Sequence, residues 1–203
     1  MSNEILYILL PDFASHEMVY LMEAISSDEQ QLKPSPKYVN RIVAPTADPV
    51  SAIGGFKVIP DYTFDNIPDD YAALVLIGGF GWTKPIAEQV LPIIRKAIEK
   101  GQIVGAICNG ASFLAKCGFL NTVRHTGNGL EQLKLWGDEN YTNPDGYIHE
   151  QAVSDKNIVT ANGSATLEFA KELLLLLEND TPERIEIYYQ FNKQGFCTLF
   201  PPE

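Results

Sequence analysis

The sequence predicts an α/β fold in the form of a three-layer sandwich, with a mostly parallel sheet and helices on both faces. Strand and helix signals alternate along the 203 residues, as in chains that build parallel sheets. Two apolar runs, YAALVLIGG at 71–79 and QIVGAIC at 102–108, are continuous, which is typical of strands buried on both faces. The length suits one domain over residues 1–203.

The first half of the chain supplies three predicted strands, one helix and a β excursion. Ser15 is a suitable N-cap for the helix, and the run KYVNRIVA alternates apolar and polar residues like a strand. Gly54 and Gly55 favour a turn inside the excursion. The elements are predicted in this order: a strand at 4–10, a helix at 15–27, a strand at 37–44, the excursion at 51–64 and a strand at 71–79.

The second half continues the alternation. Gly101 closes its first helix, and Pro182 lies near the first turn of its last one. The segment 195–203 is expected to form either an extra hairpin or a dimer contact. The elements are predicted in this order: a helix at 85–101, a strand at 102–108, a helix at 109–118, a strand at 157–163, and helices at 164–177 and 181–195.

Charge and cysteine content exclude several classes of function. The formal net charge of −11 argues against nucleic-acid and anionic-membrane partners, because their phosphates would be repelled. Three cysteines make no disulfide framework, and their odd number fits a reducing cytoplasm. The start MSNEILYILLPDF lacks the basic region of a signal peptide, and the leucine run ELLLLLEND is shorter than the ~20 residues of a membrane span. We expect a cytoplasmic protein.

Cys108 follows a predicted buried strand and begins a helix of small residues. A nucleophile elbow needs small residues two positions on either side of the nucleophile, and here these are Ala106 and Gly110. Backbone N–H groups at the helix start would lower the pKa of the thiol. The alternative is a buried structural cysteine, which is the usual fate of a free thiol.

Glu17 lies early in the predicted helix after the first strand. Its local sequence favours a solvated first-turn glutamate, which the helix dipole stabilises. The functional alternative is that Glu17 reaches across the strand ends to hydrogen-bond Cys108 and to move a proton.

The run LIGGFGW ends a second predicted strand with glycines. Gly78 and Gly79 allow backbone N–H groups to approach a ligand closely, as an oxyanion hole requires, or they form an ordinary turn. The N–H of Asn109 would be the second donor of such a hole. Phe80 and Trp82 either wall a pocket or cover the core.

The remaining histidines and cysteines carry weaker signals. His125 lies in a polar loop that could return to the site and supply a base, and His16 is expected to be exposed or to line the mouth of the site. His149 belongs to no zinc motif, because HEQAV lacks the second histidine. Cys117 and Cys197 have no partner at metal spacing, and we interpret both as structural.

Five motifs in order resemble the ThiJ/PfpI superfamily, which includes intracellular proteases and glyoxalase-type enzymes. They are PDFASHE, IGGFG, AICNG, RHTGNG and VTANGSATLEFA. The resemblance covers nearly the whole chain and implies a flavodoxin-like sandwich of the class I glutamine amidotransferase type. It implies that Cys108 is the reactive cysteine, Glu17 its acidic partner, Gly79 the oxyanion glycine and His125 the family histidine. It also implies a cytoplasmic homodimer.

Two departures from the superfamily pattern narrow the expected activity. Asn109 stands where protease-like and many glyoxalase-like members have histidine, and no late H-x-E pair follows the elbow, which disfavours peptidase and glutaminase activity. We expect a hydrolase- or lyase-like enzyme that attacks a small electrophilic carbonyl, amide or related carbon through Cys108, assisted by Glu17. The alternative is a redox-sensing or chaperone-like stress protein that uses the same cysteine without turnover. Neither function requires a cofactor or a metal.

Overall fold

The computed structural model describes residues 3–26 and 36–201. The last residue of the helix predicted at 15–27 and the last two of segment 195–203 therefore lie outside the described residues. Within the described residues, no helix combines the length and the apolar character that a membrane crossing requires.

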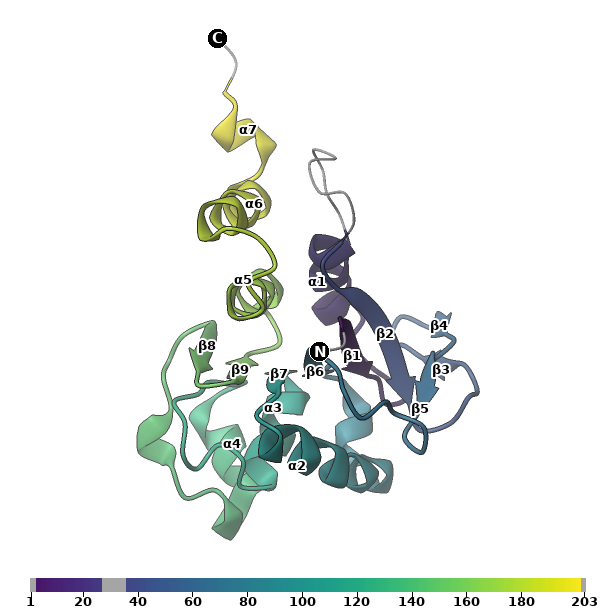
Figure 1. The fold of residues 1–203 in the computed structure, drawn as a ribbon. Helices are drawn as coiled ribbons and strands as arrows, with labels where there is room; N and C mark the ends of the chain where they lie inside the picture. The colour runs from purple at the N-terminus through teal and green to yellow at the C-terminus, as the bar shows by residue number, and fades with distance from the viewer. Residues whose placement is uncertain (1–2, 27–35, 202–203) are drawn as a thin grey trace.

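A seven-stranded sheet forms the centre of the molecule, in the order β5-β2-β1-β6-β7-β9-β8 (Figure 1). All neighbouring strands are parallel except β8 and β9, so the prediction of a mostly parallel sheet is confirmed. The strands are β1 Glu4–Ile8, β2 Val39–Ala44, β5 Tyr62–Thr63, β6 Ala73–Leu76, β7 Ile103–Ile107, β8 Ala152–Asp155 and β9 Ile158–Ala161. A separate antiparallel pair, β3 Val50–Ser51 and β4 Lys57–Val58, makes up the rest of the predicted excursion.

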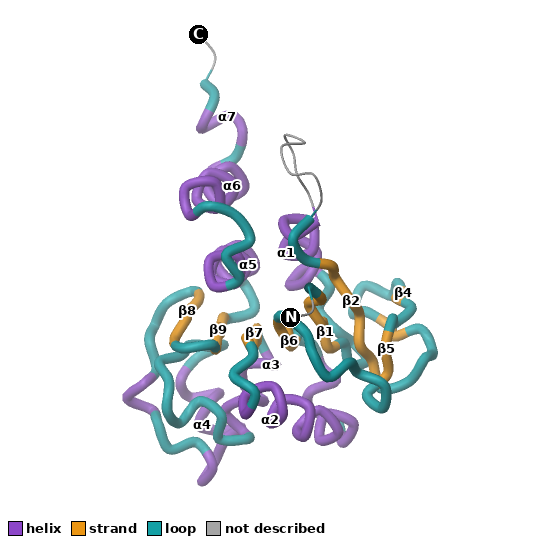
Figure 2. The backbone as a smooth tube through the Cα atoms, viewed as in Figure 1, coloured by secondary structure: helices purple, strands orange, loops and turns teal. Residues whose placement is uncertain are grey.

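Helices cover both faces of this sheet, which confirms the three-layer sandwich. Helices α1 and α5 lie on one side and α2, α3 and α4 on the other (Figures 1 and 2). Side chains of β1 alternate between the two cores, with Tyr7 on the α5 side beside Phe169 and Leu6 on the opposite side with Phe113. The helices are α1 His16–Ser26, α2 Leu91–Glu99, α3 Asn109–Lys116, α4 Leu130–Gly137, α5 Thr166–Leu176, α6 Pro182–Gln194 and α7 Phe196–Leu199.

The helix predicted at 85–101 is divided in two by its prolines. Residues Pro85–Val90 form a 3₁₀ helix, and the α-helix begins only at Leu91. Pro92 explains the boundary, because it lacks an N–H and its ring would clash with the carbonyl four residues earlier. Helix α4 and edge strand β8 were not predicted, and both lie between the helix at 109–118 and the strand at 157–163.

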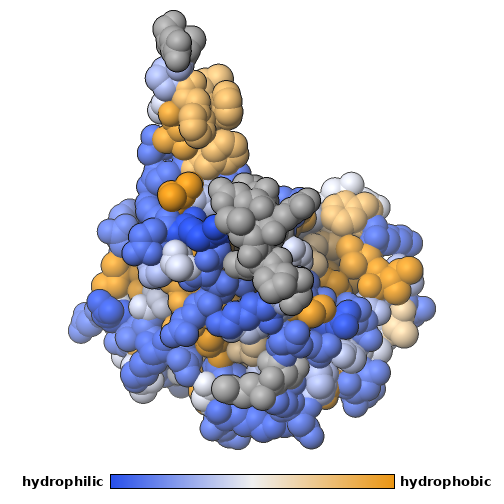
Figure 3. Space-filling view, turned by 45° about the horizontal axis from the view of Figure 1, so that its top comes forward, coloured by the Kyte–Doolittle hydropathy of each residue, from blue (hydrophilic) through white to orange (hydrophobic). Residues whose placement is uncertain are grey.

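The C-terminal segment forms a short helix, so the hairpin alternative for 195–203 is wrong. Gly195 has a φ of 82°, and this left-handed turn lets the chain leave α6 and begin α7. Helix α6 packs on α5, while α7 extends from it away from the sheet (Figure 1). The rings of Phe191, Phe196 and Phe200 lie next to one another in that order, and all three side chains are exposed in this chain. Figure 3 shows hydrophobic side chains gathered on the projecting end of the molecule.

Candidate active site

Loops that follow β1 and β6 meet at the carboxyl edge of the sheet, next to the end of β7. Parallel register places Ile8 opposite Leu76, so both chains leave the sheet at the same level. The Ala14 N–H donates to the Gly78 carbonyl at 3.0 Å, and the Phe80 N–H donates to the Asp12 carbonyl at 3.0 Å. In proteins with parallel sheets, ligand-binding and active sites form at this edge, beyond the carboxyl ends of the strands.

Cys108 occupies the strand-to-helix corner between β7 and α3. Its φ of 58° and ψ of −124° are the strained geometry of a nucleophile elbow. Gly110 must be small, because a Cβ there would lie 2.6 Å from the Leu76 carbonyl oxygen. The elbow predicted from Ala106 and Gly110 is therefore present.

Glu17 is buried beside Cys108, so the solvated position that its local sequence favours is wrong. Its side chain is only 1% exposed, and the Gly78 N–H donates to Oε2 at 2.7 Å. A Cβ on Gly78 would lie 2.5 Å from both Cys108 Cβ and Glu17 Oε2, so this glycine makes room for the pair. The carboxyl group of Glu17 therefore lies next to the Cys108 thiol, because residue 78 has no side chain to occupy that space.

The two side chains perturb each other's ionisation. Burial raises the pKa of Glu17, and hydrogen bonds from Cys108 and from the Gly78 N–H oppose that rise. Burial also raises the pKa of the Cys108 thiol, and the negative charge of Glu17 raises it further. The Asn109 N–H lowers the pKa of Cys108, as expected at a helix start, but burial and Glu17 outweigh it. Cys108 therefore holds its proton until a base removes it, and Glu17 is the carboxyl group in contact.

Two backbone N–H groups near Cys108 are suited to stabilise an oxyanion. The Gly79 N–H has no hydrogen-bond partner among the described residues, and the Asn109 N–H begins α3 and points at Cys108. The Asn109 side chain donates to the Gly79 carbonyl at 2.9 Å and fixes this loop. Gly78 has a different role, since its N–H holds Glu17.

Gly79 has a backbone geometry that only glycine adopts, with a φ of 133° and a ψ of −178°. A Cβ there would lie 2.2 Å from the Asp12 carbonyl oxygen, which cannot move without displacing the loop after β1. We expect Gly79→Ala to lower the free energy of unfolding by about 3 kcal/mol. Gly101→Ala is the control: φ is +68° there, but nothing lies within 4 Å, so we expect a loss of about 1 kcal/mol. Urea titration measures both, and equal losses would contradict this explanation.

Asn128 is a site residue that the sequence analysis missed. Its Nδ2 donates to Cys108 Sγ at 3.3 Å, and its Oδ1 accepts from the Gly163 N–H at 2.8 Å. It lies within the motif RHTGNG, from which the sequence analysis selected His125 and not Asn128 as a candidate site residue.

Asn128→Ala removes a hydrogen bond that lowers the pKa of Cys108. We therefore expect the rate of Cys108 alkylation to rise at a higher pH in the variant than in the wild type. Mass spectrometry measures this rate. Asn192→Ala on α6 is a control, because Asn192 is exposed and its side chain bonds the Tyr188 carbonyl, far from the thiol in sequence and on another helix. An unchanged Cys108 profile in Asn128→Ala would show that this contact does not affect the thiol.

The aromatic residues after Gly79 have opposite environments. Trp82 is buried, donates from Nε1 to the Ile77 carbonyl at 2.6 Å and packs on Phe113. Trp82 therefore covers the core, whereas Phe80 is 58% exposed.

The three histidines make no contact with Cys108 among the hydrogen bonds of the described residues. His16 is exposed and its Nε2 lies 3.2 Å from the Gly163 carbonyl oxygen, at the mouth of the site as expected. His125 is fully buried: its Nδ1–H donates to the Val123 carbonyl at 2.9 Å, so Nε2 accepts from the Tyr141 hydroxyl at 2.6 Å. Burial lowers the pKa of His125, which stabilises this neutral form. The structure thus gives His125 a packing role in its own loop.

The other cysteines and His149 lie outside this cluster. Cys117 is half-buried at the end of α3, and Cys197 is exposed on α7. His149 lies 3.4 Å from the Tyr147 hydroxyl. Within the described ranges, no group of histidine, cysteine and acidic side chains could hold a metal ion.

Comparisons with known proteins identify relatives of this chain. A sequence model described as the DJ-1/PfpI family matches residues 3–176. A Bacillus subtilis protein named "Uncharacterized protease YdeA" is 37% identical over 193 residues, which cover 94% of this chain and 91% of the relative. The crystal structure of a thiJ/pfpI family protein from Bacillus anthracis superposes with a TM-score of 0.88 at 30% identity, covering 98% of this chain and 93% of that one. A DJ-1 superfamily protein from Agrobacterium tumefaciens gives a TM-score of 0.83 at 33% identity, with coverages of 96% and 99%.

Proposed function

This chain belongs to the DJ-1/PfpI family, and from that premise we propose that it is a cysteine-dependent enzyme. Its substrate is a small molecule with an electrophilic carbonyl, amide or related carbon, and the reaction is of the hydrolase or lyase type. The observation that carries the proposal is the elbow thiol of Cys108 facing the buried carboxyl group of Glu17.

In the proposed mechanism Cys108 attacks the carbonyl carbon while Glu17 takes the thiol proton. A C–S bond forms as the carbonyl π bond opens onto its oxygen. The N–H groups of Gly79 and Asn109 hold the negative charge that develops on this oxygen. Glu17, a carboxyl group of raised pKa, then gives the proton to this oxygen or to the nitrogen of an amide, whose C–N bond breaks and leaves a thioester on Cys108. Water hydrolyses the thioester, which breaks the C–S bond and restores the thiol.

A screen of small aldehydes, ketones and amides tests the proposal when each compound is scored twice. Turnover is the first score, and protection of Cys108 against iodoacetamide is the second. We expect at least one compound to be consumed and to protect Cys108 while leaving the exposed Cys197 unprotected. Consumption of a compound that never protects Cys108 would place the chemistry elsewhere.

Peptidase activity is disfavoured in this proposal, although two Bacillus subtilis relatives are named as uncharacterized proteases. A cysteine peptidase needs an imidazole beside its thiol. In the described structure the position after Cys108 carries Asn109, whose side chain bonds Gly79 and Gln132, and no histidine bonds the thiol.

The redox-sensing or chaperone-like alternative relies on the same thiol without turnover. Turnover separates the two functions, because both use the same reactive thiol. Mass spectrometry after mild peroxide treatment tests the alternative itself, since a sensor oxidises at Cys108 before Cys117 and Cys197. Equal oxidation of the three cysteines would remove the alternative.

A cytoplasmic homodimer stays part of the proposal, and sedimentation of a monomer at micromolar concentration would contradict the dimer.

A further inference from the structure

A cavity of about 900 Å³ adjoins Cys108 and has no role in the mechanism above. Its walls come from residues 127–132 at the start of α4, 147–151 before β8, and 162–164 before α5. Two of its lining residues lie next to the thiol: Asn128 donates to Sγ, and Gly163 is so near that a Cβ added to it would lie 2.9 Å from Sγ. A molecule whose carbonyl carbon is attacked by Cys108 therefore has this cavity beside it for its remaining atoms.

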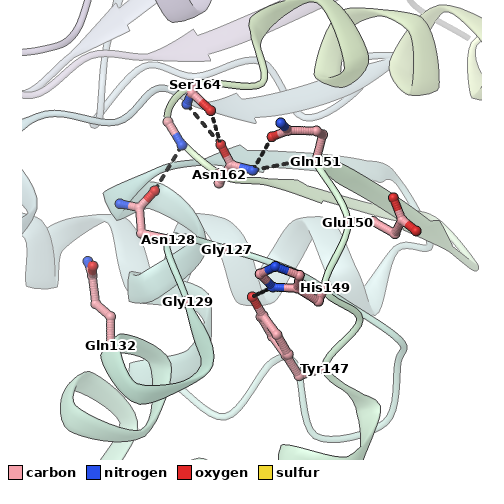
Figure 4. Close-up of a pocket in the computed structure, with 11 residues that line it drawn as sticks. Gly127, Asn128, Gly129, Gln132, Tyr147, His149, Glu150, Gln151, Asn162 and Ser164 are labelled. Atoms are coloured by element: carbon pink, nitrogen blue, oxygen red, sulfur yellow. Dashed lines mark hydrogen bonds between the residues drawn. The ribbon is translucent and has the colours of Figure 1, made fainter.

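Hydrogen-bonding side chains surround this cavity. Apart from three glycines, every lining residue is polar, and none is lysine or arginine. Four of them carry carboxamides, namely Asn128, Gln132, Gln151 and Asn162. Figure 4 shows Gln132 on one side, Tyr147 and His149 on the other, and Gln151 beside Asn162 at one end. An apolar ligand would bury those ends of the lining side chains that have no partner within the described structure, which costs free energy.

Two of the carboxamides have an unused end within the described structure. Gln132 donates from Nε2 to Asn109 Oδ1 at 3.1 Å and to Ser112 Oγ at 3.2 Å, which leaves its Oε1 as an acceptor. Gln151 Oε1 accepts from Asn162 Nδ2 at 2.5 Å, which leaves its Nε2 as a donor. A hydroxyl group both donates and accepts, so it suits such a mixed lining.

Charge restricts the ligand further. Glu150 is the carboxylate of the lining, and the chain carries a net charge of −11. Phosphate and carboxylate groups would therefore enter against repulsion, with no lysine or arginine in the lining to receive them.

We propose that this cavity selects an uncharged, polyhydroxylated carbonyl compound with its carbonyl carbon at Cys108. This inference rests on the proposed function and narrows its substrate class. The size agrees, since about 900 Å³ lies near the upper end of ligand cavities and exceeds what a three-carbon aldehyde fills. Addition of the thiol gives a hemithioacetal: the C–S bond forms, and the thiol proton moves through Glu17 to the former carbonyl oxygen.

Protection of Cys108 against iodoacetamide tests the selection with three four-carbon aldehydes: erythrose, butanal and erythrose 4-phosphate. Each half-protecting concentration is divided by the value for the same aldehyde with glutathione, which removes differences in intrinsic electrophilicity and cyclisation. At low ionic strength we expect this ratio to be about tenfold lower for erythrose than for butanal or erythrose 4-phosphate. One or two net hydrogen bonds would give a difference of that size.

Variants of the lining sharpen the test. Gln151→Leu should weaken protection by erythrose about tenfold and leave butanal unchanged. Glu150→Lys should improve the protection of Cys108 by erythrose 4-phosphate. Glu99→Lys makes the same change in net charge at the end of α2 and should not improve it. Equal protection by erythrose and butanal, or equal loss of both in Gln151→Leu, would overturn the inference alone. If no aldehyde protects Cys108 while glutathione reacts, the proposed function falls with it.

Discussion

Cys108→Ser is expected to reduce the turnover of every substrate found by about 10³-fold or more. A serine hydroxyl holds its proton far more tightly than a thiol, and the carboxyl group of Glu17 is too weak a base to remove it. Kinetics on purified variants measure the loss.

Cys117→Ser is the matched control. Cys117 lies at the end of the same helix, and burial raises its pKa to about 11, yet it has no contact with Glu17 in the described structure. We expect Cys117→Ser to keep wild-type activity and both variants to remain folded by circular dichroism. Retained turnover in Cys108→Ser would remove the thiol from the mechanism.

Glu17→Gln should reduce kcat by about 10²- to 10⁴-fold, which is the usual range for a general acid–base group. The amide oxygen can still accept from the Gly78 N–H, so the loop after β6 keeps its anchor. The amide cannot take a proton from Cys108, and it also lacks the negative charge that raises the pKa of Cys108.

Glu23→Gln provides the comparison for Glu17→Gln. Glu23 lies on the same helix α1 but is exposed, so the same chemical change there should leave kcat unaltered. Full activity in Glu17→Gln would mean that another group, or water, moves the proton.

The elbow could be predicted from sequence because its requirements are local. Small residues at Ala106 and Gly110 around Cys108 follow directly from the turn, and the structure has that turn. The burial of Glu17 is different, because it depends on Gly78, which β6 brings alongside β1 from 61 positions away in the chain. No local pattern separates that arrangement from a solvated first turn.

The loop RHTGNG illustrates the same limit. A histidine is the commonest base, so His125 was the natural choice from the sequence. The fold instead buries its ring against Tyr141 and directs Asn128, three residues later, to the thiol. Helix α4 was missed because it starts after Gly129 without a side-chain cap to mark its beginning. Strand β8 was missed because it is an antiparallel edge strand beside parallel neighbours.

The most direct test of the Cys108–Glu17 pair is the rate of alkylation against pH, resolved by cysteine, in wild type and Glu17→Gln. The carboxylate raises the pKa of Cys108, so its removal should move the Cys108 profile to lower pH. The profiles of Cys117 and Cys197 should stay where they are, since neither contacts Glu17 in the described residues. A Cys108 profile that does not move, or that moves to higher pH, would contradict the account that the charged carboxyl group of Glu17 lies against the Cys108 thiol.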